Sequence, residues 1–231
     1  MSLHVDIQLS RRKEHDQHPP FSLEVAFEAP PGITILFGPS GSGKSTTLSA
    51  IAGLIEPDRG RIALGDRIWF DRASRQNVPV HTRGIALVFQ SLALFPHLTA
   101  IQNVEYGIDR SLSNGDRRQC ALQMLERMKV PHVGDRRPAT FSGGEAQRVA
   151  LARAFAISPR LVLLDEPFSA MDRTLRQSLL ADVRAYADES KLPILHVTHH
   201  RNEARAVGDR AILLDAGRIT GVGTVDEMIR M

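Results

Sequence analysis

The stretch ITILFGPSGSGKSTTL, residues 33–48, determines how the rest of this chain can be interpreted. Its beginning, residues 33–37, is mostly apolar and predicts a buried strand, whereas residues 45–54 have the apolar spacing of a helix. A glycine-rich turn connects the two. Its positions fit the pattern G-x-x-x-x-G-K-[ST] at Gly38, Gly43, Lys44 and Ser45.

This turn is a candidate phosphate site. Glycines without side chains let backbone N–H groups curl around an anion, and the start of the following helix adds partial positive charge. Lys44 would then reach β- and γ-phosphates, and the Ser45 hydroxyl would ligate magnesium. The alternative is a chance glycine-rich turn, but the strand before it and the helix after it favour phosphate binding.

Composition narrows the class of protein. With 231 residues, 42% hydrophobic and 24% charged, the chain is typical of a soluble globular protein of one large or two small domains. No apolar run approaches the roughly 18 residues of a membrane helix, and no signal-peptide core occurs, so we expect a cytosolic chain. The net charge of +3 is mild and does not indicate nucleic acid. The one cysteine, Cys120, has the helical spacing of a packed thiol.

Several strands are predicted around the glycine turn. Alternating residues in positions 1–28 predict an antiparallel hairpin, and apolar pairs at 62–64 and 68–70 predict a second antiparallel ribbon. Continuous apolar runs predict buried strands at 85–89, 161–164, 193–197 and 211–215. Between the strand-rich portions, Ala100 to Val130 has a helical pattern. Its core-facing residues are expected to be Ala121, Met124, Leu125 and Met128.

Polar residues follow three of these predicted strands. Gln90 could orient water and magnesium beside a phosphate, Asp165 could hold magnesium through water, and Glu166 could polarise an attacking water. His199 could contact a γ-phosphate. Each also has an ordinary interpretation: a solvated strand end, a chance pair of acids or a structural histidine.

A second glycine-rich helix start occurs in FSGGEAQRVALARAFA, residues 141–156. Ser142 can cap this helix, and Gly143 and Gly144, which have no side chains, would leave the N–H groups of its first turn accessible. The segment is therefore either a second anion site or a glycine-tolerant cap. Near the end of the chain, Thr224 with Glu227 fits a capping box for a final short helix.

Taken together, the order GPSGSGKS, Gln90, FSGGE, LVLLDEP, SAMD and His199 resembles the nucleotide-binding subunits of ATP-binding-cassette (ABC) transporters over essentially the whole chain. The family's Walker A loop matches Gly38, Pro39, Ser40, Gly41, Ser42, Gly43, Lys44, Ser45 and Thr46. The remaining motifs match Gln90 (Q-loop), Ser142, Gly143, Gly144 and Glu145 (signature), Asp165 and Glu166 (Walker B), Asp172 (D-loop) and His199 (switch histidine).

The resemblance implies an α/β fold, with a P-loop NTPase core of mainly parallel sheet and flanking helices, an N-terminal antiparallel β subdomain and a helical insert. It implies one ABC ATPase domain over residues 1–231. The core and β subdomain would occupy about 1–90 and 158–231, and the helical subdomain about 91–157. We expect no C-terminal regulatory domain, because the sequence stops at Met231.

The ligands that the resemblance implies are ATP and Mg²⁺. Two subunits would pack head to tail as a homodimer or pseudo-symmetric dimer, with each ATP between one chain's phosphate loop and the other's signature helix and Asp172. Magnesium would be held by Ser45, Gln90 and Asp165. Lys44 would help to spread the phosphate charge, Glu166 would act as base on water, and His199 with Gln90 would sense the γ-phosphate.

The chain departs from the family pattern at three places. The family usually has an aromatic residue on the first hairpin that stacks on adenine; here that place falls near His15, with His18 and Phe21 as substitutes. FSGGE stands where LSGGQ is usual, and His200 replaces the aspartate that often follows the switch histidine.

Within the family, RGIALVFQSLALFPHLTAIQNVEYGI resembles the ATPases of molybdate, sulfate, polyamine and iron importers, the molybdate type most of all. This implies permease partners in the inner membrane, a solute-binding protein indirectly, no nucleic acid, and a peripheral place on the cytoplasmic face. An apolar groove for a permease helix is expected at Leu94, Phe95, Pro96 and Leu98.

Two other functions are alternatives to transport. One is a soluble, non-transport ABC ATPase of DNA repair, chromosomes or translation. That class typically has a long coiled coil or two fused cassettes, and this sequence has neither a heptad array nor a second cassette. The other is a P-loop kinase, which would leave FSGGE and His199 unexplained.

Overall fold

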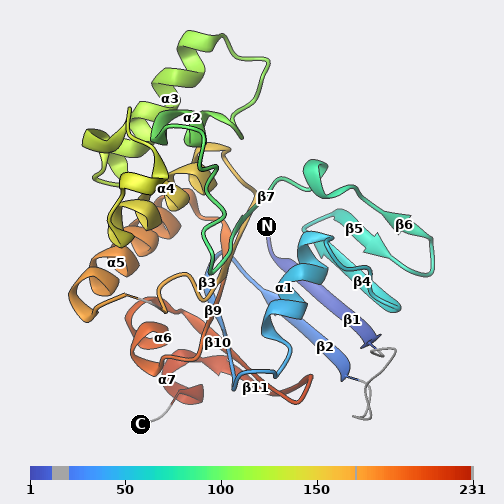
Figure 1. Cartoon of the computed structure of the whole chain (residues 1–231). Helices are drawn as coiled ribbons and strands as arrows, with labels where there is room; N and C mark the ends of the chain where they lie inside the picture. Colours follow the sequence, from blue (N-terminus) through green and yellow to red (C-terminus); the bar gives the residue numbers. More distant parts are fainter. Residues whose placement is uncertain (12–20, 170, 230–231) are drawn as a thin grey trace.

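The computed structural model describes residues 1–11, 21–169 and 171–229 and has an α/β fold (Figure 1). The strands are β1 (Leu3–Arg11), β2 (Phe21–Ala29), β3 (Gly32–Phe37), β4 (Arg59–Leu64), β5 (Arg67–Asp71), β6 (Gln76–Asn77), β7 (Ile85–Val88), β8 (Leu161–Asp165), β9 (Pro193–Thr198), β10 (Arg210–Asp215) and β11 (Arg218–Thr224). The helices are α1 (Lys44–Ala52), α2 (Ala100–Glu105), α3 (Asn114–Arg127), α4 (Gly143–Ala156), α5 (Arg173–Ser190), α6 (Arg201–Val207) and α7 (Val225–Met228).

The described strands form one sheet in the order β6-β5-β4-β1-β2-β11-β10-β3-β9-β8-β7. Strands β10, β3, β9, β8 and β7 run parallel, and the strands from β6 to β2 pair antiparallel. Strand β11 joins the two halves: it pairs antiparallel with β10 on one side and, at Arg218, with Glu24 of β2 on the other. The Glu24 N–H also donates to the Gly217 carbonyl at 2.8 Å. The expected parallel core and antiparallel hairpins are confirmed, and the antiparallel strands continue the same sheet.

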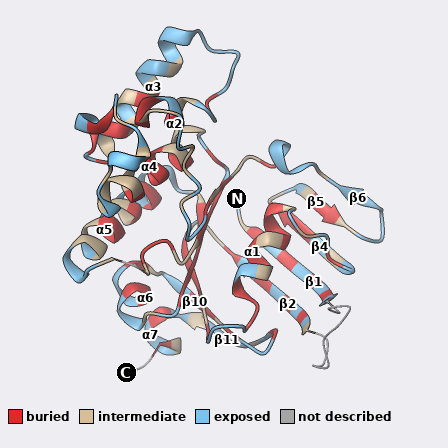
Figure 2. Cartoon of the chain, in the orientation of Figure 1, coloured by how far each residue is buried: buried red, intermediate tan, exposed pale blue. Residues whose placement is uncertain are grey.

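Alternate residues of the parallel strands pack into two apolar cores. In β8, Val162 and Leu164 pack with helices α2 to α5, whereas Leu161 and Leu163 pack with α1 and the antiparallel strands. Figure 2 shows these central strands as buried, between helices on one side and α1 on the other. Strands that are buried on both faces have continuous apolar sequences. This explains why apolar runs in the sequence identified them.

The helical insert differs from the prediction in one respect. The pattern predicted helix throughout Ala100–Val130, but α2 ends at Glu105 and α3 begins at Asn114. The intervening segment contains Ser113, whose side chain caps α3 by accepting the Asp116 N–H at 3.1 Å. Local capping therefore divides the helix. The predicted core residues Ala121, Leu125 and Met128 are buried, and Met124 is half-buried against them, as is Cys120.

Three further details concern the element boundaries. The helix predicted over residues 45–54 is α1, which ends at Ala52 because Gly53 adopts a left-handed conformation with φ of 85°. Strand β11 was not predicted, because it has the glycine-containing sequence RITGVGT with no fully buried residue. Helix α6 was not predicted either. None of the helices in the described part of the chain has the length and apolar character needed to cross a bilayer.

Candidate functional site

The glycine turn lies between β3 and α1, as predicted, and its shape requires glycine at two positions. A Cβ on Gly38 would lie 2.0 Å from the Leu214 carbonyl oxygen. Gly43 precedes α1 with φ of 107°, a conformation that other residues rarely adopt. No described side chain caps α1, so the N–H groups of its first turn have no side-chain acceptor among the described residues. This is the arrangement that binds anions at helix starts.

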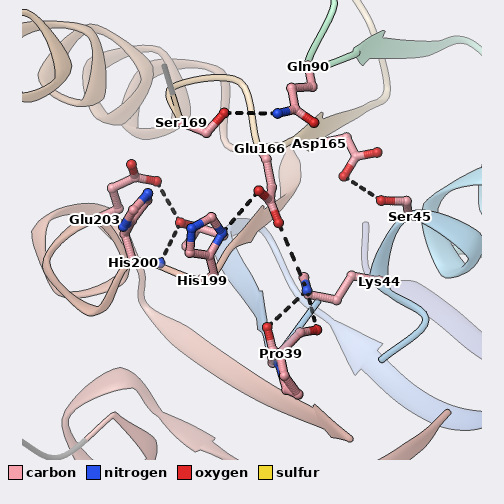
Figure 3. Close-up of polar contacts among 12 residues, drawn as sticks. Pro39, Lys44, Ser45, Gln90, Asp165, Glu166, Ser169, His199, His200 and Glu203 are labelled. Atoms are coloured by element: carbon pink, nitrogen blue, oxygen red, sulfur yellow. Dashed lines mark hydrogen bonds and ion pairs between the residues drawn. The ribbon is translucent and has the colours of Figure 1, made fainter. Parts of the chain in front are cut away.

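Lys44 lies over this turn in a largely buried position. Its Nζ donates to the carbonyl oxygens of Gly38 and Pro39, at 2.9 and 2.8 Å, and lies 3.9 Å from Glu166 Oε1 (Figure 3). Burial lowers the pKa of Lys44, while Glu166 and Asp165 oppose that shift. The ammonium is therefore held at the mouth of the loop with the two carboxylates as its charged neighbours.

The carboxylates occupy the end of β8, close to α1. The Ser45 hydroxyl donates to Asp165 Oδ1 at 3.0 Å, which joins the helix start to the strand end. Burial raises the pKa of Asp165, and the hydrogen bond from Ser45 acts in the opposite direction. A hydroxyl and a carboxylate oxygen at this distance are hard oxygen donors of the kind that Mg²⁺ prefers.

Glu166 lies between Lys44 and His199. Its Oε2 is 3.0 Å from His199 Nδ1, and its N–H donates to the Val197 carbonyl at 3.1 Å. Its backbone has φ of 45°, which costs about 1–2 kcal/mol for a residue other than glycine. Figure 3 shows His199 pointing toward Glu166 from the end of β9. Packing between neighbouring strands therefore holds this carboxylate in a strained position at the site.

Gln90 approaches the same group of residues from the end of β7. Its Nε2 donates to the hydroxyl of Ser169, at 3.2 Å. Ser169 was not among the predicted site residues, because a serine after a strand-end acid carries no signal of its own. Its contact with Gln90 depends on two distant segments meeting at one sheet edge.

A cavity of about 450 Å³ joins these residues. It is lined by Phe21, Ser40, Gly41, Gly43, Lys44, Ser45, Thr46, Gln90, Asp165 and Glu166. Of the three candidates for the adenine contact, Phe21 lies at this cavity, with its ring against Gly43. His15 and His18 lie outside the described residues. The cavity thus combines a cationic loop, two carboxylates and one aromatic ring.

The second glycine-rich helix start is α4. Ser142 caps it, and Glu145 completes a capping box by accepting the Ser142 N–H at 2.7 Å. This hydrogen bond and one from His132 lower the pKa of Glu145 to about 2. The spacing S-x-x-E was present in the sequence, although only Ser142 was selected as a cap.

This second helix start borders a separate hollow of about 510 Å³. Ser142, Gly143, Gly144 and Asp172 line it, and Asp172 also caps α5 through the Leu175 N–H at 3.0 Å. None of the described residues lines both this hollow and the cavity at Lys44. The fold therefore brings Ser142 and Asp172 together but keeps them apart from the phosphate loop of the same chain.

Fold and site together define an α/β domain with an anion-binding loop at the carboxyl ends of parallel strands, where such folds bind ligands. The family model described as "ABC transporter" matches residues 24–169. The chain belongs to this family.

Curated relatives agree with that assignment. The molybdenum import ATP-binding protein ModC of Pseudomonas fluorescens is 38% identical over 99% of this chain and 62% of its own length. The molybdate/tungstate import ATP-binding protein WtpC of Archaeoglobus fulgidus is 42% identical over 90% of this chain and 84% of its own length. The chain thus spans less than two thirds of that ModC relative and more of WtpC.

Solved structures show the same fold. A dimeric bacterial ABC transporter cassette, MJ0796, superposes with a TM-score of 0.83 at 28% identity and covers 97% of this chain and 99% of its own. The same cassette in a post-hydrolysis state bound to ADP and Pi gives a TM-score of 0.82. The α/β fold expected from the sequence is confirmed.

Proposed function

We propose that this chain binds and hydrolyses ATP as the energising subunit of an ABC importer. The observation that carries the proposal is the cavity in which Lys44, Ser45, Asp165 and Glu166 meet at the ends of separate elements. Its mixture of ammonium, hydroxyl and carboxylate groups suits a magnesium-bound nucleoside triphosphate. We further propose that the chain consists of a core with its β subdomain and of a helical subdomain at about residues 91–157.

The residues present fit a magnesium ion that is shared with phosphate oxygens. No cluster of three or more His, Cys, Asp or Glu that could hold a metal occurs among the described residues. Ser45, Asp165 and Gln90 therefore supply a partial set of oxygens, as in sites where nucleotide phosphates complete the coordination. When bound, magnesium would neutralise charge on the β- and γ-phosphates.

Hydrolysis would use the two oxygens of Glu166. Lys44 would transfer its hydrogen bonds from the loop carbonyls to the phosphates. The carboxylate would then accept a proton as water attacks the γ-phosphorus and the bond to the bridging oxygen of ADP breaks. His199, whose Nδ1 lies 3.0 Å from Glu166 Oε2, would orient both Glu166 and the γ-phosphate.

The second hollow supports a two-chain site. Ser142 and Asp172 lie apart from Lys44 within one chain, so ATP bound at Lys44 would meet them only on a second copy packed head to tail. A helix start with glycines in its first turn offers N–H donors to the γ-phosphate. The dimeric form of the MJ0796 cassette is consistent with this homodimer.

The transported substrate is proposed from the relatives. Those named above are import proteins for molybdenum or for molybdate and tungstate, and this chain would serve an oxyanion importer of that kind. Its partners would be integral-membrane permease subunits and, indirectly, a solute-binding protein. It would act as a peripheral subunit on the cytoplasmic face of the inner membrane.

The function can be tested with the chain, its permease and its solute-binding protein in proteoliposomes. We expect MgATP hydrolysis to rise when the binding protein carries molybdate and to stay basal with sulfate. Stimulation by sulfate alone would redirect the cargo. No hydrolysis under any condition would contradict the ATPase proposal itself.

Phe21 provides a prediction about the nucleotide base. Phe21→Ala should weaken ATP binding about 5- to 150-fold, because stacking of a base on an aromatic ring contributes about 1–3 kcal/mol. Calorimetric titration with ATP would measure this, with Phe21→Trp as the matched variant that retains a ring. Tripolyphosphate has no base, so its affinity should be equal in all three proteins. A parallel loss for tripolyphosphate would mean that Phe21 supports the loop instead.

The permease contact gives a second prediction. Leu94, Phe95 and Leu98 are half-buried and Pro96 is exposed, and the buried Asn103 fixes the loop through the N–H and carbonyl of Phe95. The Phe95 ring contacts Tyr106, which is 57% exposed, with ring centroids 4.4 Å apart. This exposed aromatic surface is the part that a permease helix could cover.

Tyr106→Asp should therefore abolish co-purification with the permease and leave ATP affinity unchanged. Leu112→Asp, at another exposed apolar residue, is the matched control and should still co-purify. Retention of the permease by Tyr106→Asp would place the docking surface elsewhere.

A further inference from the structure

A buried group of polar side chains lies directly behind the switch histidine. Glu203, in the first turn of α6, is 2% exposed, and His196, on β9, is 1% exposed. Neither residue lines the cavity at Lys44. Burying a carboxylate is unfavourable unless it is paired and hydrogen-bonded, so its partners indicate what it holds in place.

The first partners of Glu203 are on the segment that carries His199. Glu203 Oε2 accepts a hydrogen bond from the Thr198 hydroxyl at 2.7 Å, and that hydroxyl oxygen accepts the His200 N–H at 3.0 Å. Thr198 and His200 are the residues on either side of His199. Figure 3 shows Glu203 beside His200, on the side away from Glu166. The carboxylate therefore holds the Thr198 side chain before the histidine, and through that side chain it holds the His200 N–H after it.

The other partners connect this carboxylate to the segment that follows Glu166. Arg176 Nε lies 3.3 Å from Glu203 Oε1, and Arg176 Nη2 donates to the Met171 carbonyl at 2.7 Å. His196 lies 3.5 Å from Glu203 Oε2 and stacks on Phe168, with ring centroids 5.8 Å apart. Phe168 and Met171 both belong to the loop between Glu166 and α5. The network thus touches that loop at two points.

The charge state of Glu203 agrees with this pairing. Burial alone would raise the pKa of Glu203, but the nearby His196 ring and the hydrogen bond from Thr198 outweigh it, and the net shift is downward. The residue is consequently a carboxylate that faces the Arg176 guanidinium. A carboxylate that accepts a hydrogen bond on Oε2 and faces a guanidinium at Oε1 has much less freedom than an apolar contact.

We propose that Glu203, held by Arg176 and Thr198, is a positioning residue that sets His199 against Glu166. This inference rests on the proposed ATPase function, in which His199 and Glu166 act at the γ-phosphate. Glu203 itself touches neither Glu166 nor the cavity. It acts by fixing the two loops whose side chains meet at the 3.0 Å contact between His199 and Glu166.

The kinetic test uses Glu203→Gln, which keeps the shape of the side chain and loses its charge. The single-turnover rate at saturating MgATP should fall about 10- to 100-fold, which is the effect expected when a reacting group is displaced slightly from its productive position. ATP affinity should stay within about twofold, because Lys44 and the loop are untouched. In a His199→Ala background the same substitution should have no further effect on the rate. An equal loss in both backgrounds would overturn the proposal, since Glu203 would then act without His199.

Asp209→Asn is the matched control. Asp209 is also a carboxylate that pairs with an arginine of α5, Arg184, at 2.8 Å, and it accepts the Ile33 N–H at 2.8 Å. It lies at the opposite end of β3 from the phosphate loop. This variant removes the charge of another arginine-paired carboxylate and should leave the turnover rate unchanged. If both variants lose the same activity, the effect of Glu203 is merely structural and the proposal fails.

A readout without nucleotide separates this inference from the proposed function. The ring signals of His199 in a histidine-labelled NMR spectrum, assigned with His199→Ala, should move in Glu203→Gln and stay in place in Asp209→Asn. Unmoved signals in Glu203→Gln would overturn the positioning role even if the wild type hydrolyses ATP. Conversely, moved signals in a chain without ATPase activity would support the positioning and reject the proposed function.

Discussion

Replacing Glu166 with glutamine is expected to lower ATP hydrolysis by about 10²- to 10⁴-fold, because an amide cannot accept the proton of the attacking water. ATP should still bind, since the glutamine side chain keeps the size of Glu166 and Lys44 remains in place. Removal of a charge 3.9 Å from the Lys44 ammonium should leave that lysine available to phosphate. Hydrolysis and nucleotide affinity measured on the same preparation would check both parts.

The same variant tests the two-chain site. Binding without turnover should accumulate a dimer that sizing chromatography detects with MgATP and not without it. Adding Ser142→Arg should abolish this dimer, because the larger side chain would fill the helix start that meets ATP from the other chain. A Glu166→Gln protein that stays monomeric at high ATP and protein concentration would count against the composite site, whereas wild-type hydrolysis rates would remove Glu166 from the mechanism.

Lys44→Met is expected to have the second large effect. It keeps the aliphatic stem and removes the ammonium, so ATP affinity should fall about 10- to 150-fold, the equivalent of about 1.5–3 kcal/mol for a charge-assisted hydrogen bond. Hydrolysis should fall at least as much. The fold should persist, because burying the ammonium is itself unfavourable, as the lowered pKa of Lys44 reflects.

Lys191→Met is the matched control for this experiment, since Lys191 is an exposed lysine at the end of α5. It should bind ATP as the wild type does. Equal nucleotide affinity in Lys44→Met would contradict the phosphate-loop assignment. A large drop in melting temperature for Lys44→Met alone would mean that the hydrogen bonds from Lys44 to Gly38 and Pro39 serve mainly to hold the loop.

Much of the fold could be predicted because its strands are buried on both faces. Residues 161–164 are a continuous apolar run, residues 193–197 are apolar except for His196, and the two segments form β8 and β9 as expected. The glycine turn was predictable for a different reason. Gly38 has no room for a Cβ, and Gly43 has a positive φ. Both positions therefore require glycine, and this requirement is visible in the sequence.

Other features carried little local signal. The break between α2 and α3 was missed because a helical pattern on both sides concealed the cap at Ser113. Strand β11 was missed because it has no fully buried residue. The left-handed backbone of Glu166 could not be predicted either, since glutamate does not favour that conformation and only its surroundings impose it.

The sequence by itself determined the parallel strands, the phosphate loop and the identity of the polar residues at the strand ends, because periodicity and glycine requirements are local properties. Only the tertiary structure decided which of those residues meet. It placed Phe21 at the cavity, joined Gln90 to Ser169, separated Ser142 from Lys44, and put Glu203 behind His199. Such contacts join segments that are far apart in the chain, and their geometry follows from how the strands are ordered in the sheet and how the helices pack on it.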